Sequence, residues 1–291
     1  MSERCTDAAL RRGDQLAGTA TFVRAFLLVE HGGPWGEVAL RDARLPDETR
    51  EWLRRQVAET RVRVLLVRRP GARAGSRPRV FAVRTGEWCE STVLDRIDDV
   101  RSLDLTALAA GRSAGLERWT DPVVLVCTHG RHDACCAERG RPVAAALAAS
   151  APEQVWECSH VGGDRFAGNV LVLPVGLGFG WVDASRAPGL LADLASGLLD
   201  LDLLRGRATL SMPAQFAEVH LRRELGERRL DALRHVGSRR DGDEVVSTFE
   251  VQDATYDVRV RSEYGEPATL TCRATRDNPV LRHEVTAVLR R

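Results

Sequence analysis

Two segments of the sequence carry thiol and imidazole groups directly after apolar runs. The first reads VVLVCTHGRHDACC and has eight residues between Cys127 and Cys136. The second reads VWECSHVGGDRF and holds His160 and Asp164. Thiolates and imidazoles are the groups that hold iron or zinc in proteins. We therefore take these two segments as the candidate metal-binding part of the chain.

The setting of the two cysteines favours metal ligands over a pair of buried structural thiols. Cys127 follows four apolar residues, which predict a buried strand at 123–126 with a fixed backbone. Cys136 comes just before a predicted helix at 138–149, and N–H groups near a helix N-terminus stabilise a thiolate. Two structural cysteines in a core segment are the alternative. The loop between them is too polar for such a segment, since it holds His129, Arg131, His132 and Asp133.

His160 and Asp164 are separated by a valine and two glycines. Two glycines allow a tight turn with positive φ, so both side chains can point to the same side. A lone histidine is most often a surface group, but this one follows a strand that should neighbour the strand before Cys127. Asp164 has alternative roles, because it could pair with Arg131 or Arg165 or accept backbone N–H groups of the turn.

Two further cysteines adjoin these residues. Cys158 lies two residues before His160 and would share its face on a continuing strand, so it is the best substitute for Asp164 as fourth ligand. Cys135 adjoins Cys136, and adjacent residues do not easily bind one ion without strain.

The remaining cysteines stand alone in the sequence, and isolated cysteines are more often small buried groups than ligands. They are Cys5, Cys89 and Cys272. The total of seven is odd. In a reducing compartment we expect metal ligands, reactive thiols or buried residues rather than disulfides.

The composition excludes several classes of function. The chain has 291 residues and a net charge of +1, so no whole-protein field attracts nucleic acid or an anionic membrane. All 42 basic residues are arginine, which excludes a Schiff-base lysine and a Walker A lysine. The N-terminus reads MSERCTDAALRRGD and lacks the apolar stretch of a signal peptide, and no apolar run approaches the length of a membrane span. We expect a cytoplasmic protein.

Hydrophobic periodicity predicts three consecutive units, an N-terminal α/β unit at 1–118, a second α/β unit at 119–205 and a C-terminal α+β unit at 206–291. In the first unit we expect strands at 22–30, 63–67 and 80–83, a helix at 47–59, a Gly/Arg/Pro loop at 69–79, and a linker or short helix at 107–116.

The second unit has the order β-α-β-β-β-α, which is the thioredoxin-like order and requires a right-handed crossover between its first two strands. We expect strands at 123–126, 155–157, 169–173 and 178–182, and helices at 138–149 and 187–199, with Pro142 in the first turn of the former.

The first unit shows a blurred version of the same order, since FLLVEHGGPWG aligns loosely with VVLVCTHGRHD. We interpret it as a degenerate, metal-free repeat. In the third unit we expect a helix at 214–236 broken at Gly226, followed by antiparallel strands at 244–251, 255–262 and 268–274.

The stretches CTHGRHDACC and WECSHVGGDRFAGNVLVLP resemble the sucrase/ferredoxin-like family of thioredoxin-like [2Fe–2S] proteins, over about residues 120–200. FLLVEHGGPWG also resembles the N-terminal region common in that family. Fungal relatives hold their cluster with two Cys and two His, and their pattern ends in H-x-G-G-H. By position the resemblance implies Cys127 and Cys136 as the thiolate ligands and His160 as the first histidine. Asp164 stands where the family pattern has its second histidine.

The resemblance implies an iron–sulfur electron carrier or redox sensor with a [2Fe–2S] cluster and mixed Cys/His/Asp ligation. Such a protein needs a redox partner protein and need not turn over a substrate. Its potential should lie between those of plant-type ferredoxins, about −400 mV, and Rieske centres, about −150 to +300 mV. Glycosidase activity is not expected, because no paired carboxylates have a suitable setting.

Two alternatives remain open. One is a thiol-dependent redox enzyme of thioredoxin-like fold, in which Cys127, Cys135 or Cys136 is a nucleophile of low pKa. The other is structural zinc held by two Cys and one His together with Cys158 or Asp164.

Overall fold

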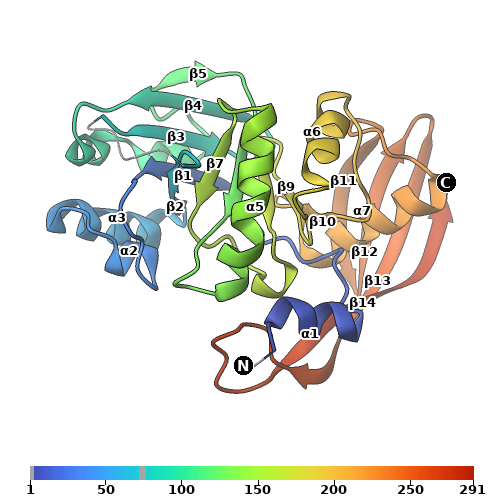
Figure 1. Cartoon of the computed structure of the whole chain (residues 1–291). Helices are drawn as coiled ribbons and strands as arrows, with labels where there is room; N and C mark the ends of the chain where they lie inside the picture. Colours follow the sequence, from blue (N-terminus) through green and yellow to red (C-terminus); the bar gives the residue numbers. More distant parts are fainter. Residues whose placement is uncertain (1–2, 72–76) are drawn as a thin grey trace.

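The computed structural model describes residues 3–71 and 77–291, and the described chain forms two β-sheets (Figure 1). The larger sheet is mixed and has ten strands in the order β10-β9-β8-β6-β7-β2-β1-β3-β4-β5. The smaller one is antiparallel, in the order β11-β12-β13-β14. The predicted mixed α/β class is confirmed. The predicted loop at 69–79 lies partly outside the described residues.

The strands of the larger sheet are β1 Ala25–Glu30, β2 Arg63–Arg68, β3 Arg79–Arg84, β4 Trp88–Val93, β5 Glu117–Trp119, β6 Val123–Cys127, β7 Val155–Cys158, β8 Val170–Leu173, β9 Leu177–Phe179 and β10 Leu204–Arg207. The helices are α1 Cys5–Arg12, α2 Ala39–Asp42, α3 Asp47–Thr60, α4 Leu105–Ala109, α5 Ala134–Ser150, α6 Ala187–Ala195 and α7 Met212–Leu225. Two 3₁₀ turns, η1 Ile97–Ser102 and η2 Asp164–Phe166, complete this part.

The two halves of the larger sheet repeat one topology. In the first half β1 and β2 are parallel and joined through α3, and β3 runs antiparallel to β1. In the second half β6 and β7 are parallel and joined through α5, and β8 runs antiparallel to β6. The two halves thus share one element order, and the internal repeat stays a prediction.

The halves meet where β2 pairs antiparallel with β7, through Val67 with Cys158 and Arg68 with Glu157. The segments assigned to the first two predicted units therefore contribute to one continuous sheet. The predicted boundary near residue 118 does not separate two sheets. That it separates two folding units stays a prediction.

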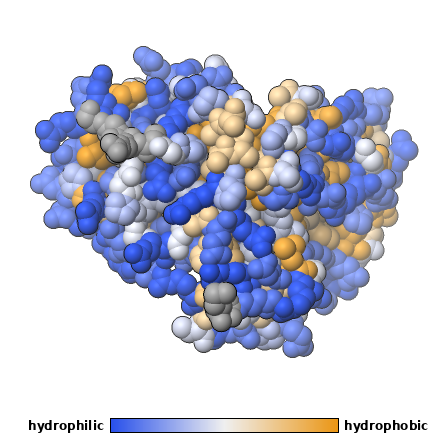
Figure 2. All heavy atoms as spheres, in the orientation of Figure 1, coloured by the Kyte–Doolittle hydropathy of each residue, from blue (hydrophilic) through white to orange (hydrophobic). Residues whose placement is uncertain are grey.

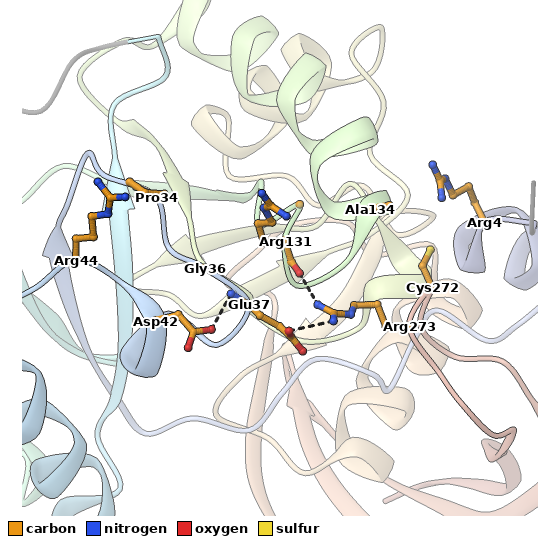
Figure 3. Close-up of a pocket in the computed structure, with 11 residues that line it drawn as sticks. Arg4, Pro34, Gly36, Glu37, Asp42, Arg44, Arg131, Ala134, Cys272 and Arg273 are labelled. Atoms are coloured by element: carbon orange, nitrogen blue, oxygen red, sulfur yellow. Dashed lines mark hydrogen bonds and ion pairs between the residues drawn. The ribbon is translucent and has the colours of Figure 1, made fainter.

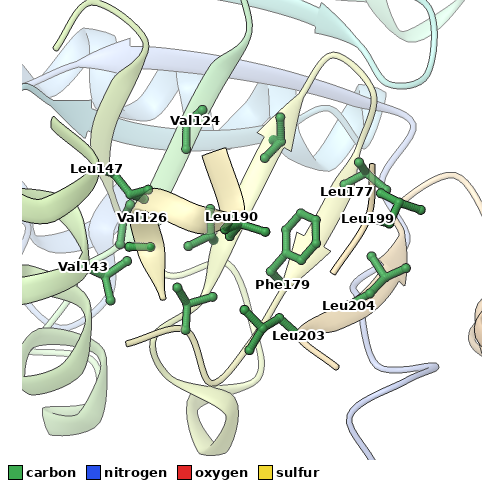
Figure 4. Close-up of a cluster of buried hydrophobic side chains, with 14 of the residues drawn as sticks. Val124, Val126, Val143, Leu147, Leu177, Phe179, Leu190, Leu199, Leu203 and Leu204 are labelled. Carbon is green, nitrogen blue, oxygen red and sulfur yellow. The ribbon is translucent and has the colours of Figure 1, made fainter. Parts of the chain in front are cut away.

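Alternate residues of β6 face opposite sides of the sheet, as strand geometry requires. Val124 and Val126 join a core with Val143 and Leu147 of α5 and with Phe179 (Figure 4). Cys127 faces the other side, in a second buried cluster. Each fully buried Leu or Phe contributes about 1.5–3 kcal/mol, so the strand end that carries Cys127 is firmly held.

The C-terminal sheet packs against α7 and consists of β11 Leu233–Asp241, β12 Glu244–Val251, β13 Ala254–Ala268 and β14 Asn278–Arg290. The predicted helix at 214–236 is wrong beyond residue 225, because Gly226 adopts the left-handed conformation, φ 64°, and ends the helix. The predicted strand at 268–274 is also wrong. The fourth strand is β14, where Val280 and His283 are buried.

Three smaller boundaries differ from expectation. The first strand begins at Ala25 rather than at residue 22, and α6 ends at Ala195 rather than at 199. Helix α5 begins four residues earlier than predicted, so Pro142 lies in its interior. Its N-cap is Asp133, which accepts the N–H of Cys135 at 2.8 Å and places both adjacent cysteines in the first turn.

The face of the molecule seen in Figure 2 is mostly hydrophilic, with hydrophobic side chains gathered in its upper middle. Within the described part of the chain, no helix has the length and apolar character needed to cross a bilayer.

Candidate metal centre

The two cysteines predicted as ligands come from a strand end and a helix start. Cys127 is the last residue of β6, Cys136 lies in the first turn of α5, and both are fully buried. Helix and strand touch at Gly140, where an added Cβ would lie 2.0 Å from the Cys127 carbonyl oxygen. Only glycine permits this approach, and the approach fixes where the two sulfurs stand.

His160 and Asp164 follow β7, which is parallel to β6, so both loops leave the same edge of the sheet. Gly162 and Gly163 have φ of +97° and +79°, as the predicted tight turn requires. Arg205 stabilises the turn, because its Nη1 donates to the Gly162 carbonyl at 3.0 Å. Burial lowers the pKa of Arg205 to about 9.

The structure brings all four predicted ligands together. The sulfurs of Cys127 and Cys136 and a ring nitrogen of His160 lie within 4.8 Å of one another. Oδ1 of Asp164 lies 3.3 Å from the Cys136 sulfur and 3.0 Å from Nδ1 of His160. Asp164 does not pair with Arg165, because Nε of that arginine faces Asp14 at 3.0 Å.

His132 is a further member of the site that the sequence did not single out. Its ring stacks on that of His160 with 3.8 Å between centroids, and its Nε2 lies 3.9 Å from Oδ2 of Asp164. Its Nδ1 faces the Glu37 carbonyl at 3.3 Å, which assigns the proton to Nδ1 and leaves Nε2 free to bind. The sequence feature that could have identified His132 as a site residue is its position in the loop between Cys127 and Cys136.

His129 is not available as a ligand. Its Nε2 donates to the Gly36 carbonyl at 2.9 Å, and its Nδ1 accepts the N–H of His160 at 3.2 Å. It is a neutral connector between the two loops and the N-terminal half, and burial lowers its pKa.

Cys158, the predicted substitute, is fully buried beside Cys127 in the parallel register of β6 and β7. Among the described residues it belongs to no group of ligand atoms close enough to share an ion. Burial raises the pKa of its thiol, which favours a structural role.

Two of the three cysteines that stand alone in the sequence are not isolated in the structure. Cys89 is buried, as expected, and in the described chain it belongs to no group of potential ligand atoms. Cys5 and Cys272 instead meet Cys135 in a group with Asp133. Sequence separation hid this contact, since Cys5 and Cys272 are 267 positions apart in the chain.

The charges of the site are coupled. A hydrogen bond from the Cys136 thiol lowers the pKa of Cys127 well below its usual range, against burial, and raises that of Cys136. Burial would lower the pKa of His160, but Asp164 and Cys127 raise it to about 9. Burial would raise the pKa of Asp164, yet His160 lowers it. Metal binding must therefore release protons from Cys136 and His160.

The donor set fits a thiophilic metal centre. Nδ1 of His160 is buried and, in the described chain, makes no hydrogen bond of good geometry, although it faces Asp164. A buried nitrogen that faces only other potential ligand atoms is suited to a ligand role once its proton has left. The sulfurs are inaccessible, whereas the side chains of His160 and His132 are 24% and 32% exposed.

Comparison with known proteins agrees with this reading at the level of the family. No curated protein and no solved structure matches the chain. The model of one family, described as sucrase/ferredoxin-like, matches residues 16–206. This range includes both loops of the candidate site and the whole ten-stranded sheet except Arg207, the last residue of β10. The chain therefore belongs to the sucrase/ferredoxin-like family.

Proposed function

We propose that this protein is an electron carrier or redox sensor that binds a [2Fe–2S] cluster through Cys127, Cys136, His160 and Asp164. The observation that carries the proposal is the meeting of two buried sulfurs with a buried imidazole nitrogen and a carboxylate at one sheet edge. Such a cluster, when bound, supplies one-electron exchange.

The topology of the second half supports a thioredoxin-like domain. Its strands lie in the order β7-β6-β8-β9, with β6 and β7 parallel and with β8 and β9 antiparallel to their neighbours. The candidate ligands follow β6 and β7, as in the family pattern described from the sequence.

The gradient of burial supports different roles for the two sides of the site. Cys127 and Cys136 hold the inner side, shielded from water and from oxidants. His160 and His132 form the solvent-facing side and offer the shortest route for an electron to leave. A redox partner protein would dock over the two imidazoles through a small, transient contact.

Buried cations near the site would favour its reduced form. Arg63 is largely desolvated, which lowers its pKa, and its Nη2 donates to the His160 carbonyl at 3.0 Å. Arg205 is also buried and donates to the Gly162 carbonyl of the same loop. Both support a potential above the range of plant-type ferredoxins, at about −400 mV.

The fourth ligand has two candidates. Asp164 lies closest to the Cys136 sulfur, but His132 offers a free Nε2 beside His160. Comparing Asp164→Ala, His132→Ala and Cys158→Ala by iron content decides between them. We expect Asp164→Ala to lose the most iron and Cys158→Ala to lose none.

The ligand set is tested by substitution of one thiol and one imidazole. Cys136→Ser should lose most of its iron, and His160→Cys should keep iron but have a lower potential, because a thiolate adds negative charge. Iron at wild-type stoichiometry in Cys136→Ser contradicts the assignment. Zinc in place of iron, measured by elemental analysis of the wild type, would instead support the structural-zinc alternative.

A further inference from the structure

Three cysteines from distant parts of the chain form a second thiol cluster. Cys5 begins α1, Cys135 lies in the first turn of α5, and Cys272 lies between β13 and β14. Their sulfurs are separated by 3.6 Å, 3.4 Å and 3.5 Å, a nearly equilateral triangle. In Figure 1, α1 and the β13–β14 segment lie together below the N-terminal end of α5.

The fourth corner of the cluster is Asp133, the N-cap of α5, which is fully buried. Both of its carboxylate oxygens lie 3.8 Å from the Cys5 sulfur. They accept the N–H groups of Cys135 at 2.8 Å and of Cys272 at 2.6 Å, which fixes the carboxylate against the triangle. Each oxygen keeps a further lone pair.

We propose that Cys5, Cys135, Cys272 and Asp133 form a structural Zn²⁺ site. A tetrahedral ion 2.3 Å from each sulfur separates the sulfurs by about 3.8 Å, close to the observed triangle. A disulfide requires about 2.05 Å and would leave one of the three thiols unpaired. The mutual closeness of all three sulfurs suits a single ion rather than a two-iron cluster, whose ligands divide between two metals.

The new site is distinct from the proposed iron site, although they share α5. Consecutive residues of its first turn serve one site each, Cys135 the zinc site and Cys136 the iron site. Cys5 and Cys272 lie outside residues 16–206, which match the family. The zinc would join α1 and the C-terminal sheet to the helix that carries Cys136.

The surroundings fit an anionic metal site with one open side. Three thiolates, a carboxylate and Zn²⁺ carry a net charge of −2, which the α5 N-terminus stabilises. Cys272 is the only half-buried member and lines a pocket of about 660 Å³ (Figure 3). Arg4 and Arg273 line the same pocket, paired with Glu138 and Glu37 respectively, and the pocket gives the ion a path of entry.

The test measures iron and zinc per chain in full-length protein purified under reducing conditions. We expect one zinc bound at this site in the wild type. Cys5→Ser and Cys272→Ser should each lose it and keep their iron, with the zinc Kd raised about a hundredfold or more in competition with a chelator. Cys136→Ser should lose iron and keep this zinc, so failure of one site is distinguishable from failure of the other. Cys89→Ser, at a thiol outside both sites, should keep both metals.

Two results would overturn the proposal. One is that reduced wild-type protein takes up no zinc outside the iron site when zinc is supplied. This result counts equally if mass spectrometry shows that the thiols formed a disulfide before reduction. The other is Cys5→Ser and Cys272→Ser retaining zinc at wild-type affinity. If either variant fails to fold, cobalt(II) titration of iron-loaded wild type decides: thiolate-to-cobalt charge-transfer absorption saturating at one ion supports the site, and its absence refutes it.

Discussion

Replacing Gly140 by alanine should separate the two sulfurs of the proposed iron site. The new Cβ would lie 2.0 Å from the Cys127 carbonyl oxygen, and real Cβ contacts are essentially never under 3.0 Å. Helix α5 must therefore move away from β6, and Cys136 moves with it. Such overpacking costs about 1–3 kcal/mol. Alanine has a helix propensity about 1 kcal/mol more favourable than that of glycine. If the overpacking costs about 3 kcal/mol, the free energy of unfolding therefore falls by about 2 kcal/mol.

The matched control is Gly189→Ala in α6, where an added Cβ meets nothing within 4 Å. It should gain about 0.5–1 kcal/mol from propensity alone. Urea unfolding followed by circular dichroism measures both free energies, and iron content reports on the site. Gly140→Ala as stable as Gly189→Ala, with wild-type iron, would refute the reasoning that this contact positions the ligands.

Three further predictions concern the second loop and the buried histidines. Arg205→Met should lower the free energy of unfolding by at least about 3 kcal/mol, because it leaves the Gly162, Asn169 and Thr19 acceptors unpaired. The control Arg54→Met, at an exposed side chain, should change the free energy of unfolding by under about 0.5 kcal/mol. Equal effects of the two substitutions in denaturant titration would contradict this. In the reduced protein, Asp164→Ala should perturb the paramagnetic spectrum more than His132→Ala, and the reverse order would make His132 the fourth ligand. Burial lowers the pKa of His283, so its contribution to stability is present above pH 6.5, about its unfolded pKa, and is lost as pH falls through its folded pKa. The stability of His283→Gln should fall less steeply than that of wild type below about pH 6.5, and parallel curves would show that this histidine does not titrate on unfolding.

The local elements around the proposed iron site could be predicted because their signals lie close together in the sequence. Four apolar residues before Cys127 predict a strand, and the glycines before Asp164 predict the turn that the structure shows. Two parallel strands then place both loops at one edge. His132 could have been added by the same logic, since it lies in the loop between the two cysteines.

What the sequence did not predict depends on long-range contacts. The pairing of β2 with β7 joins two similar halves edge to edge, and no local pattern encodes that register. The meeting of Cys5 with Cys272 requires α1 and the β13–β14 segment to pack on α5 together. Helix α5 starts early because Asp133 caps its N-terminus. The prediction from the sequence places the helix start close to Pro142 instead.

The central claim is most directly tested by electron paramagnetic resonance of the dithionite-reduced protein, with iron measured on the same sample. The account predicts two irons and one unpaired spin per chain, with an average g value typical of a ligand set that includes nitrogen rather than of four sulfurs. A colourless protein that gives no signal after anaerobic reconstitution with iron and sulfide would contradict it.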